Sequence, residues 1–128
     1  MELSDGRIFI TFSLKRQRVL IYRDVLRALG KPGCFRFLID DETNRLAMQV
    51  CAFGDAGFHI APDFSDKDPG WSYEICSTEL LELIWDLCDW DPEGSYRVAG
   101  VLCPDIHVII FELNDAEKTS GSEFDVAK

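Results

Sequence analysis

Residues 71–114, WSYEICSTELLELIWDLCDWDPEGSYRVAGVLCPDIHVIIFELN, carry the pattern that decides the predicted fold. The first five residues favour a strand. Ser77 then stands at an N-cap position before an amphipathic helical run, which the turn sequence DPEG at 91–94 ends. Residues 95–102 and 107–114 are rich in β-branched and aromatic residues, and the proline-containing turn CPDI separates them. The stretch therefore predicts a strand, a helix and a hairpin in that order.

The same order of elements occurs earlier in the chain. Residues 19–22 predict a strand, 24–29 a helix, and 34–40 and 45–51 a hairpin, and a further alternating strand precedes them at 7–14. Each hairpin follows its helix after a turn that contains both proline and glycine. We therefore expect an α+β fold: a mostly antiparallel sheet with two helices packed on one face, built from two β-α-β-β units.

Length and composition indicate one domain. The 128 residues are 47% apolar and 28% charged, as in soluble globular proteins, and no apolar run approaches the ~20 residues of a membrane span. Residues 1–116 are predicted to form a single α+β domain, and 117–128, which are polar and aperiodic, a flexible acidic tail. The five cysteines are scattered without a C-x-x-C spacing, which favours reduced thiols. With no basic, apolar leader at the N-terminus, the sequence predicts a cytoplasmic protein.

Charge is divided unevenly along the chain. Residues 1–38 hold eight Lys and Arg against three Asp and Glu, whereas residues 39–128 hold five against twenty, and the net charge is −10. This balance argues against direct binding of nucleic acid, because phosphate contacts need clustered cations. It suits a basic partner, such as a protein that handles nucleic acid.

The helix predicted over 77–90 separates acidic from apolar residues. At about 100° per residue, four apolar residues share the face toward the sheet: Leu80, Ile84, Leu87 and Cys88. Four acids share the opposite face: Glu79, Glu82, Asp86 and Asp89. Trp85 and Trp90 fall at the borders between the two faces, where aromatic rings are typical of interface anchors. Asp66 and Asp68 add acid in the preceding loop. A solvated face that keeps the protein soluble is the alternative explanation.

Metal binding and catalysis receive less support from the sequence. Cys51 with His59, and Cys103 with His107, are Cys/His pairs that follow equivalent strands, so zinc bound by all four is an alternative, although neither spacing is common in zinc sites. No nucleophile motif or glycine-rich phosphate loop occurs. We therefore expect no enzymatic activity and no cofactor.

The runs at 20–51, LIYRDVLRALGKPGCFRFLIDDETNRLAMQVC, at 73–102, YEICSTELLELIWDLCDWDPEGSYRVAGVL, and at 107–116, HVIIFELNDA, resemble small proteins of Gram-positive mobile elements. Anti-CRISPR proteins, which inhibit the effector nucleases of CRISPR systems, are similar in size, acidity and setting, and several of them are acidic mimics of nucleic acid. The resemblance implies an inhibitor of that kind. Anti-CRISPR proteins share neither a fold nor a catalytic residue, so the resemblance assigns no residue a role.

The expected function is therefore that of a non-enzymatic inhibitor. Its acids and tryptophans would dock on a basic, nucleic-acid-binding groove, of which a CRISPR effector nuclease is the specific case, without contacting nucleic acid or membrane itself. One alternative is a dimeric, DNA-associated regulator that uses the basic N-terminal third, namely Lys15, Arg16, Arg18, Arg23, Arg27, Lys31 and Arg36. Pairing of these cations with acids of the same chain is equally compatible with the sequence. The other alternative is a zinc-bearing structural module.

Overall fold

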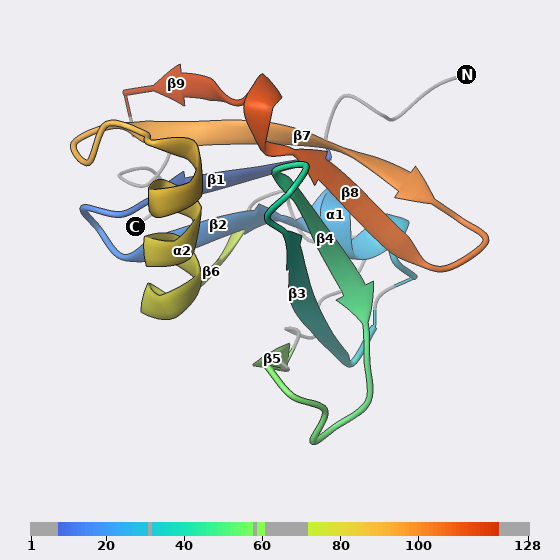
Figure 1. The fold of residues 1–128 in the computed structure, drawn as a ribbon. Coiled ribbons are helices and arrows are strands. Elements are labelled where there is room, and N and C mark those ends of the chain that lie inside the picture. Colours follow the sequence, from blue (N-terminus) through green and yellow to red (C-terminus); the bar gives the residue numbers. More distant parts are fainter. Residues whose placement is uncertain (1–7, 31, 58, 61–71, 121–128) are drawn as a thin grey trace.

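The chain forms an antiparallel sheet that curls into a half-barrel (Figure 1). The computed structural model describes residues 8–30, 32–57, 59–60 and 72–120. Over these residues the strands are β1 (Phe9–Ser13), β2 (Arg18–Tyr22), β3 (Cys34–Asp40), β4 (Arg45–Val50), β5 (His59–Ile60), β6 (Ser72–Ile75), β7 (Ser95–Cys103), β8 (Val108–Glu112) and β9 (Glu117–Thr119). The helices among the described residues are α1 (Arg23–Ala28) and α2 (Thr78–Cys88), and the 3-10 turn η2 (Leu113–Asp115) follows β8.

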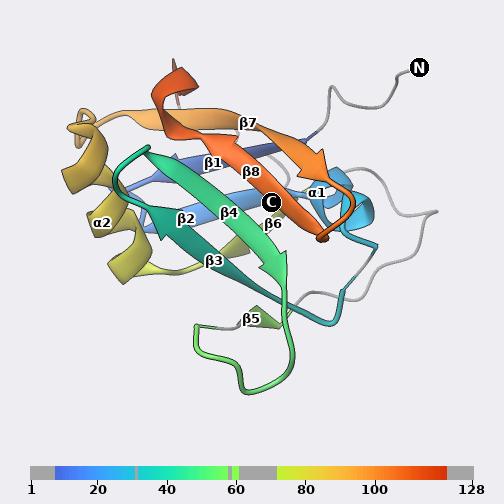
Figure 2. The same ribbon diagram turned by 45° about the vertical axis from the view of Figure 1, so that its right-hand side comes forward.

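The long strand β7 joins the two walls of the half-barrel. Its residues 95–99 pair with β1, whereas its residues 100–103 pair with β8. The strand order is β5-β3-β4-β8-β7-β1-β2-β6, with β9 added beside β7. The β3-β4-β8 wall crosses the β1-β2-β6 wall in both ribbon views (Figures 1 and 2).

The predicted α+β fold, with two helices packed on one face of the sheet, is wrong. Strands dominate the structure, and α2 and α1 lie at opposite ends of the curled sheet (Figures 1 and 2). The physical reason is the twist between neighbouring strands, which accumulates across a sheet of many strands and curls it around its own apolar side. Each helix then covers one end of that curled side.

Gly100 lies at the point where β7 passes from one wall to the other. Its neighbour Ala99 pairs with β1, and Gly100 itself pairs with Phe111 of β8. A Cβ atom at Gly100 would stand 2.5 Å from Cε1 of Phe111 and 2.6 Å from Cγ2 of Ile109. Glycine is therefore required at this position, because any Cβ atom would clash with the two core side chains that pack against the backbone there.

The strand pairings repeat between the two halves of the chain. The order β1-β2-α1-β3-β4 is followed by β5-β6-α2-β7-β8. Within the halves, the pairing of β3 with β4 corresponds to the pairing of β7 with β8. Between the halves, the pairing of β1 with β7 corresponds to the pairing of β5 with β3. The pairs β4–β8 and β2–β6 join the halves directly. The repeating unit thus contains one more strand than predicted, because β5 has only two residues and no readable alternation.

One core fills the concave side of the sheet and receives both helices. It includes Ile10 and Phe12 of β1, Leu26 of α1, Ile84 of α2 and Phe111 of β8, all fully buried.

The bounds of β3 agree with the strand predicted over residues 34–40. Helix α1 ends at Ala28, and Gly30 follows its C-cap Leu29 at φ +83°, the left-handed conformation expected of this glycine.

Residues 117–119, which the sequence places in a flexible tail, form strand β9 against 95–97 of β7. Beside this backbone pairing, Arg97 pairs with Glu117 at 2.9 Å, and Nζ of Lys118 lies 2.7 Å from Oδ2 of Asp91. A three-residue strand carries too little apolar period to be recognised from sequence. The domain therefore extends past residue 116.

We expect Lys118→Met to raise the pKa of Asp91 toward the ordinary aspartate value of about 3.9. The hydrogen bond from Lys118 is the largest cause that lowers this pKa, followed by the N–H of Glu93. Because folding lowers the pKa of Asp91, the ionised carboxylate stabilises the fold at pH values above the pKa of Asp91 in the unfolded chain. This stability is lost as the pH falls through the pKa of Asp91 in the folded protein. NMR titration of the Asp91 carboxyl carbon checks this, with Lys15→Met, which removes only the pair with Glu93, as the control.

Candidate functional site

Helix α2 owes its position to an apolar face and its end to a left-handed residue. Leu81, Ile84 and Trp85 are buried against the core. Ser77 occupies the N-cap position, although its hydroxyl makes no capping hydrogen bond. Asp89 takes φ 55° at the C-cap, and its N–H donates to the oxygen of Trp85 at 2.8 Å. The helix thus ends before the predicted residue 90, and Asp89 follows its last turn.

The α2 acidic face, which we define as Glu79, Glu82 and Asp86, is exposed to solvent. Among the described residues, no Lys or Arg lies within ion-pair distance of these carboxylates or of Asp89. The acids of the adjoining turn differ, because Asp91 and Glu93 pair with Lys118 and Lys15. Leu83 lies beside the α2 acidic face with 43% of its surface exposed. The face therefore combines unneutralised charge with an accessible apolar side chain.

The two tryptophans form an aromatic cluster beneath this surface. Trp85 is only 6% exposed, and its Nε1 donates to the backbone oxygen of Asp91 at 3.0 Å. Trp90 is half-buried and stacks on Tyr96 with ring centroids 4.3 Å apart. Trp85 meets Trp90 edge-on at 5.0 Å. Trp85 thus anchors α2 and offers no surface to a partner, whereas Trp90 keeps a partly exposed edge next to Asp89.

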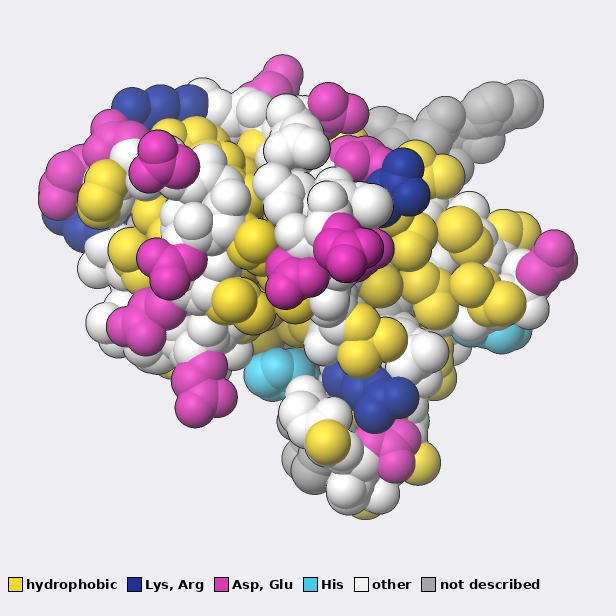
Figure 3. All heavy atoms as spheres, viewed as in Figure 1, with side chains coloured by type: hydrophobic (Ala, Val, Ile, Leu, Met, Phe, Trp, Pro, Cys, Tyr) yellow, Lys and Arg dark blue, Asp and Glu magenta, His cyan; other side chains and the backbone are white. Residues whose placement is uncertain are grey.

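The other predicted acids fall into two groups. Asp66 and Asp68 lie outside the described residues. Asp40, Asp41 and Glu42 are exposed at the β3–β4 turn. There the N–H of Glu42 donates to Oδ1 of Asp40 at 3.0 Å, and this hydrogen bond is the first cause that lowers the pKa of Asp40. These acids and the α2 acidic face lie on the same side of the molecule (Figure 3).

Much of the basic N-terminal third pairs with acids of the same chain. Lys15 pairs with Glu93, Arg18 with Glu74, and Arg27 with Asp24. Arg36 donates to Oε1 of Gln49 at 2.9 Å. Lys31 and the side chain of Arg23 lie outside the described part of the chain, and Arg16 makes an interaction of its own. Pairing with acids of the same chain, which the sequence left open, therefore occurs at Lys15, Arg18 and Arg27.

The Cys/His pairs considered for zinc sit in different parts of the fold. Cys51 and His59 flank the loop that leads into β5, whereas Cys103 and His107 flank the β7–β8 turn at the far end of that hairpin (Figure 1). Within the described residues, no three His, Cys, Asp or Glu side chains come together as metal ligands would. The four residues thus do not form one centre.

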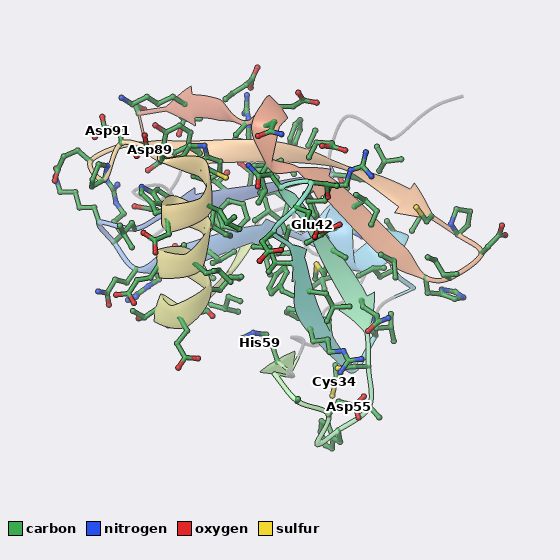
Figure 4. All side chains as sticks on the ribbon, viewed as in Figure 1. Cys34, Glu42, Asp55, His59, Asp89 and Asp91 are labelled. Carbon is green, nitrogen blue, oxygen red and sulfur yellow. The ribbon has the colours of Figure 1, made fainter. Side chains whose placement is uncertain are left out.

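A pocket of about 340 Å³ lies between the start of α2 and the β3–β5 edge. Its lining is Phe37, Gly57, His59, Ser77, Glu79 and Leu80. The His59 ring stacks on Phe35 at 5.5 Å and meets Phe37 at 5.9 Å (Figure 4). Burial of the His59 ring between these groups disfavours its charged form and lowers its pKa. The fold therefore loses stability as pH falls through the ordinary histidine pKa of about 6.5, where the unfolded chain takes up the proton first.

The outer face of the β3-β4-β8-β7 wall carries an apolar row that sequence reasoning missed. Leu38, Ala47, Ile110 and Val101 stand opposite one another across the four strands. Leu38 is 43% exposed and Val101 69% exposed. The signal was present in the alternation of each strand, where these residues occupy positions that polar residues normally fill. Only the register between strands shows that they form a single row.

No helix among the described residues has the length and apolarity needed to cross a membrane. Comparison of the chain with protein-family models, with curated proteins and with solved structures gave no match.

Proposed function

We propose that this protein is a non-enzymatic inhibitor that binds a basic groove of a nucleic-acid-handling protein through the α2 acidic face. The observation that carries the proposal is the absence, among the described residues, of any cation paired with Glu79, Glu82 or Asp86, while Lys15, Lys118 and other described cations pair elsewhere. Like charges three and four residues apart on a helix repel one another. A basic partner relieves that repulsion and gains complementarity of charge.

The spacing of the acids matches the spacing of phosphates only loosely. Glu79, Glu82 and Asp86 follow one another every three or four residues, which is about 4.5–6 Å along a helix axis. Phosphates of one nucleic-acid strand recur about every 3.4 Å. Leu83, exposed beside the acids, supplies the apolar contact that the sequence assigned to Trp85. A CRISPR effector nuclease is the specific partner we propose to test, and we place the protein in the cytoplasm, where such nucleases act.

The alternative of a DNA-associated regulator receives less support. The cations it needs at Lys15, Arg18 and Arg27 are paired with Glu93, Glu74 and Asp24. Binding to phosphate through them requires those pairs to break.

The double substitution Glu82→Lys and Asp86→Lys tests the proposal. We expect it to weaken inhibition of DNA binding by a guide-loaded CRISPR nuclease by about tenfold or more, mainly through slower association. Both side chains are exposed, so each substitution should change the free energy of unfolding by no more than about 0.5 kcal/mol. Raising the salt concentration should weaken the wild type in the same way, because salt screens exposed charges.

A matched control is Asp105→Lys with Asp115→Lys, which makes the same change in net charge at exposed positions in the β7–β8 turn and in η2. The control protein should inhibit like the wild type. Equal loss in both double variants would mean that total charge matters and the α2 acidic face does not. Inhibition that survives Glu82→Lys and Asp86→Lys would make the acids a solubility device.

A further inference from the structure

Strand β3 has an edge next to α2 that no strand of the described residues covers beyond Phe35. Over the described residues, β3 pairs with β4 along 35–40, but it pairs with β5 only at Cys34 and Phe35. Beyond Phe35, no described strand continues on that side. The start of α2 lies next to this edge, because Phe37 of β3 and Leu80 of α2 line the same pocket. We call the edge of β3 from Phe37 to Ile39, together with this pocket, the α2–β3 groove.

The backbone of β3 offers hydrogen-bonding groups to the groove. The oxygen of Cys34 accepts from the N–H of Cys51, so the polar groups of Cys34 point toward β4. These groups alternate in direction along an antiparallel strand. Those of Arg36 and Leu38 therefore point to β4, and those of Phe37 and Ile39 point into the α2–β3 groove. Unpaired groups of this kind are a template for another strand.

The walls of the groove are suited to an apolar side chain. Phe37, Ile39 and Leu80 are partly buried and pack on the core. The pocket of about 340 Å³ lined by Phe37, His59 and Leu80 lies at one end of the groove. Pockets that hold small ligands begin at about 300 Å³, so this one has room for a large side chain.

Acidic side chains stand on both sides of the groove. On one side is the α2 acidic face, and on the other are Asp41 and Glu42 at the end of β3. Figure 3 shows these two acidic groups with apolar surface between them, and the His59 ring labelled in Figure 4 lies at the lower end. The nearest described cation at that turn, Arg45, pairs with Glu112. The charge of the groove thus favours a positively charged occupant.

We infer that the α2–β3 groove binds an extended peptide segment of the partner as an added strand on β3, with Lys or Arg alternating with apolar residues. The segment pairs with the backbone of Phe37 and Ile39 and places an apolar side chain in the pocket. Its cations then reach the acids on either rim. Strand addition of this kind takes affinity from the backbone and specificity from alternate side chains. The inference rests on the proposed function for the partner's positive charge.

The test uses the peptide acetyl-Lys-Val-Lys-Phe-Lys-Val-Lys-amide and amide hydrogen exchange measured by NMR. In the free protein, the amides of Phe37 and Ile39 should exchange fast, while those of Arg36 and Leu38 should be protected by β4. Bound peptide should slow exchange at Phe37 and Ile39 by about tenfold or more. When a peptide residue lies opposite Phe37 in an antiparallel pair, the two side chains are on the same face of the sheet, and the two residues point their backbone N–H and C=O groups toward each other. N-methylation of the Val and Phe amides should therefore weaken binding by about tenfold or more.

Four results would overturn the inference: Phe37 and Ile39 already protected in the free protein, no binding of the unmodified peptide, binding without protection of these two amides, or equal binding of the N-methylated peptide. The Glu82→Lys, Asp86→Lys protein separates this inference from the proposed function. If that variant loses nuclease inhibition while the peptide never protects Phe37 and Ile39, the acidic face binds a partner without strand addition. If the peptide protects both amides and the variant still inhibits, the groove is real and the acidic face is not the inhibitory site.

Discussion

Replacing Trp85 with alanine is expected to lower the free energy of unfolding by about 3–5 kcal/mol, the usual cost of removing a large aromatic side chain from a core. Trp85 is 6% exposed, contacts the rings of Trp90 and Tyr96, and donates its indole N–H to the oxygen of Asp91. Its loss thus opens a cavity and leaves a carbonyl without its donor at the end of α2. Chemical denaturation followed by far-ultraviolet circular dichroism measures the change.

Trp85→Phe keeps a ring and removes the N–H, so it should cost clearly less than Trp85→Ala. Leu83→Ala is the surface control, because Leu83 is 43% exposed on the same helix. It should change the free energy of unfolding by no more than about 0.5 kcal/mol. If Trp85→Ala costs no more than Leu83→Ala, Trp85 is exposed in solution, and the interface role that the sequence suggested for it would be restored.

The second large effect is expected at Gly100, where alanine should lower the free energy of unfolding by about 1–3 kcal/mol. The added Cβ would meet Phe111 at 2.5 Å and Ile109 at 2.6 Å, and both side chains are fully buried and cannot move aside freely. The strain falls on the bend that joins the two walls of the half-barrel.

Gly33→Ala is the matched control, because a Cβ atom at Gly33 meets no heavy atom within 4 Å. It should be neutral or slightly stabilising, since alanine restricts the unfolded chain more than glycine does. If Gly100→Ala is as well tolerated as Gly33→Ala, the packing of Phe111 over β7 is looser than the structure shows. The double variant Gly100→Ala with Phe111→Leu should recover part of the loss, because the two positions are in direct contact.

The buried Trp85 also explains how α2 can hold so much uncompensated acid. Like charges on the exposed face disfavour the helix by only a few tenths of a kcal/mol per pair. Burial of Leu81, Ile84 and Trp85 outweighs this, because each large apolar side chain contributes roughly 1.5–3 kcal/mol. The acidic face can thus be altered without loss of the helix, which is why charge reversal at Glu82 and Asp86 is a usable test.

Local patterns predicted most of the elements correctly. The strand at 34–40, the helix end at Gly30 and the hairpins around DETN and CPDI are present in the structure. Each depends on neighbours in sequence: alternation of apolar residues, a glycine with positive φ, or a polar turn. The exposure of Glu79, Glu82 and Asp86 also follows from sequence, because the angular position of a residue on a helix depends only on its number.

The sequence by itself determined where most strands and the two helices lie, which side of α2 is acidic and where the net charge is concentrated. Tertiary structure alone decided the curl of the sheet, the pairing of β1 with β7, the burial of Trp85 and the edge of β3 that no described strand covers. These features join residues far apart in the chain, such as Phe12 with Tyr96 and Cys34 with Ile60. Strand twist and packing against a common core set such contacts, and neither leaves a periodic signal in the sequence.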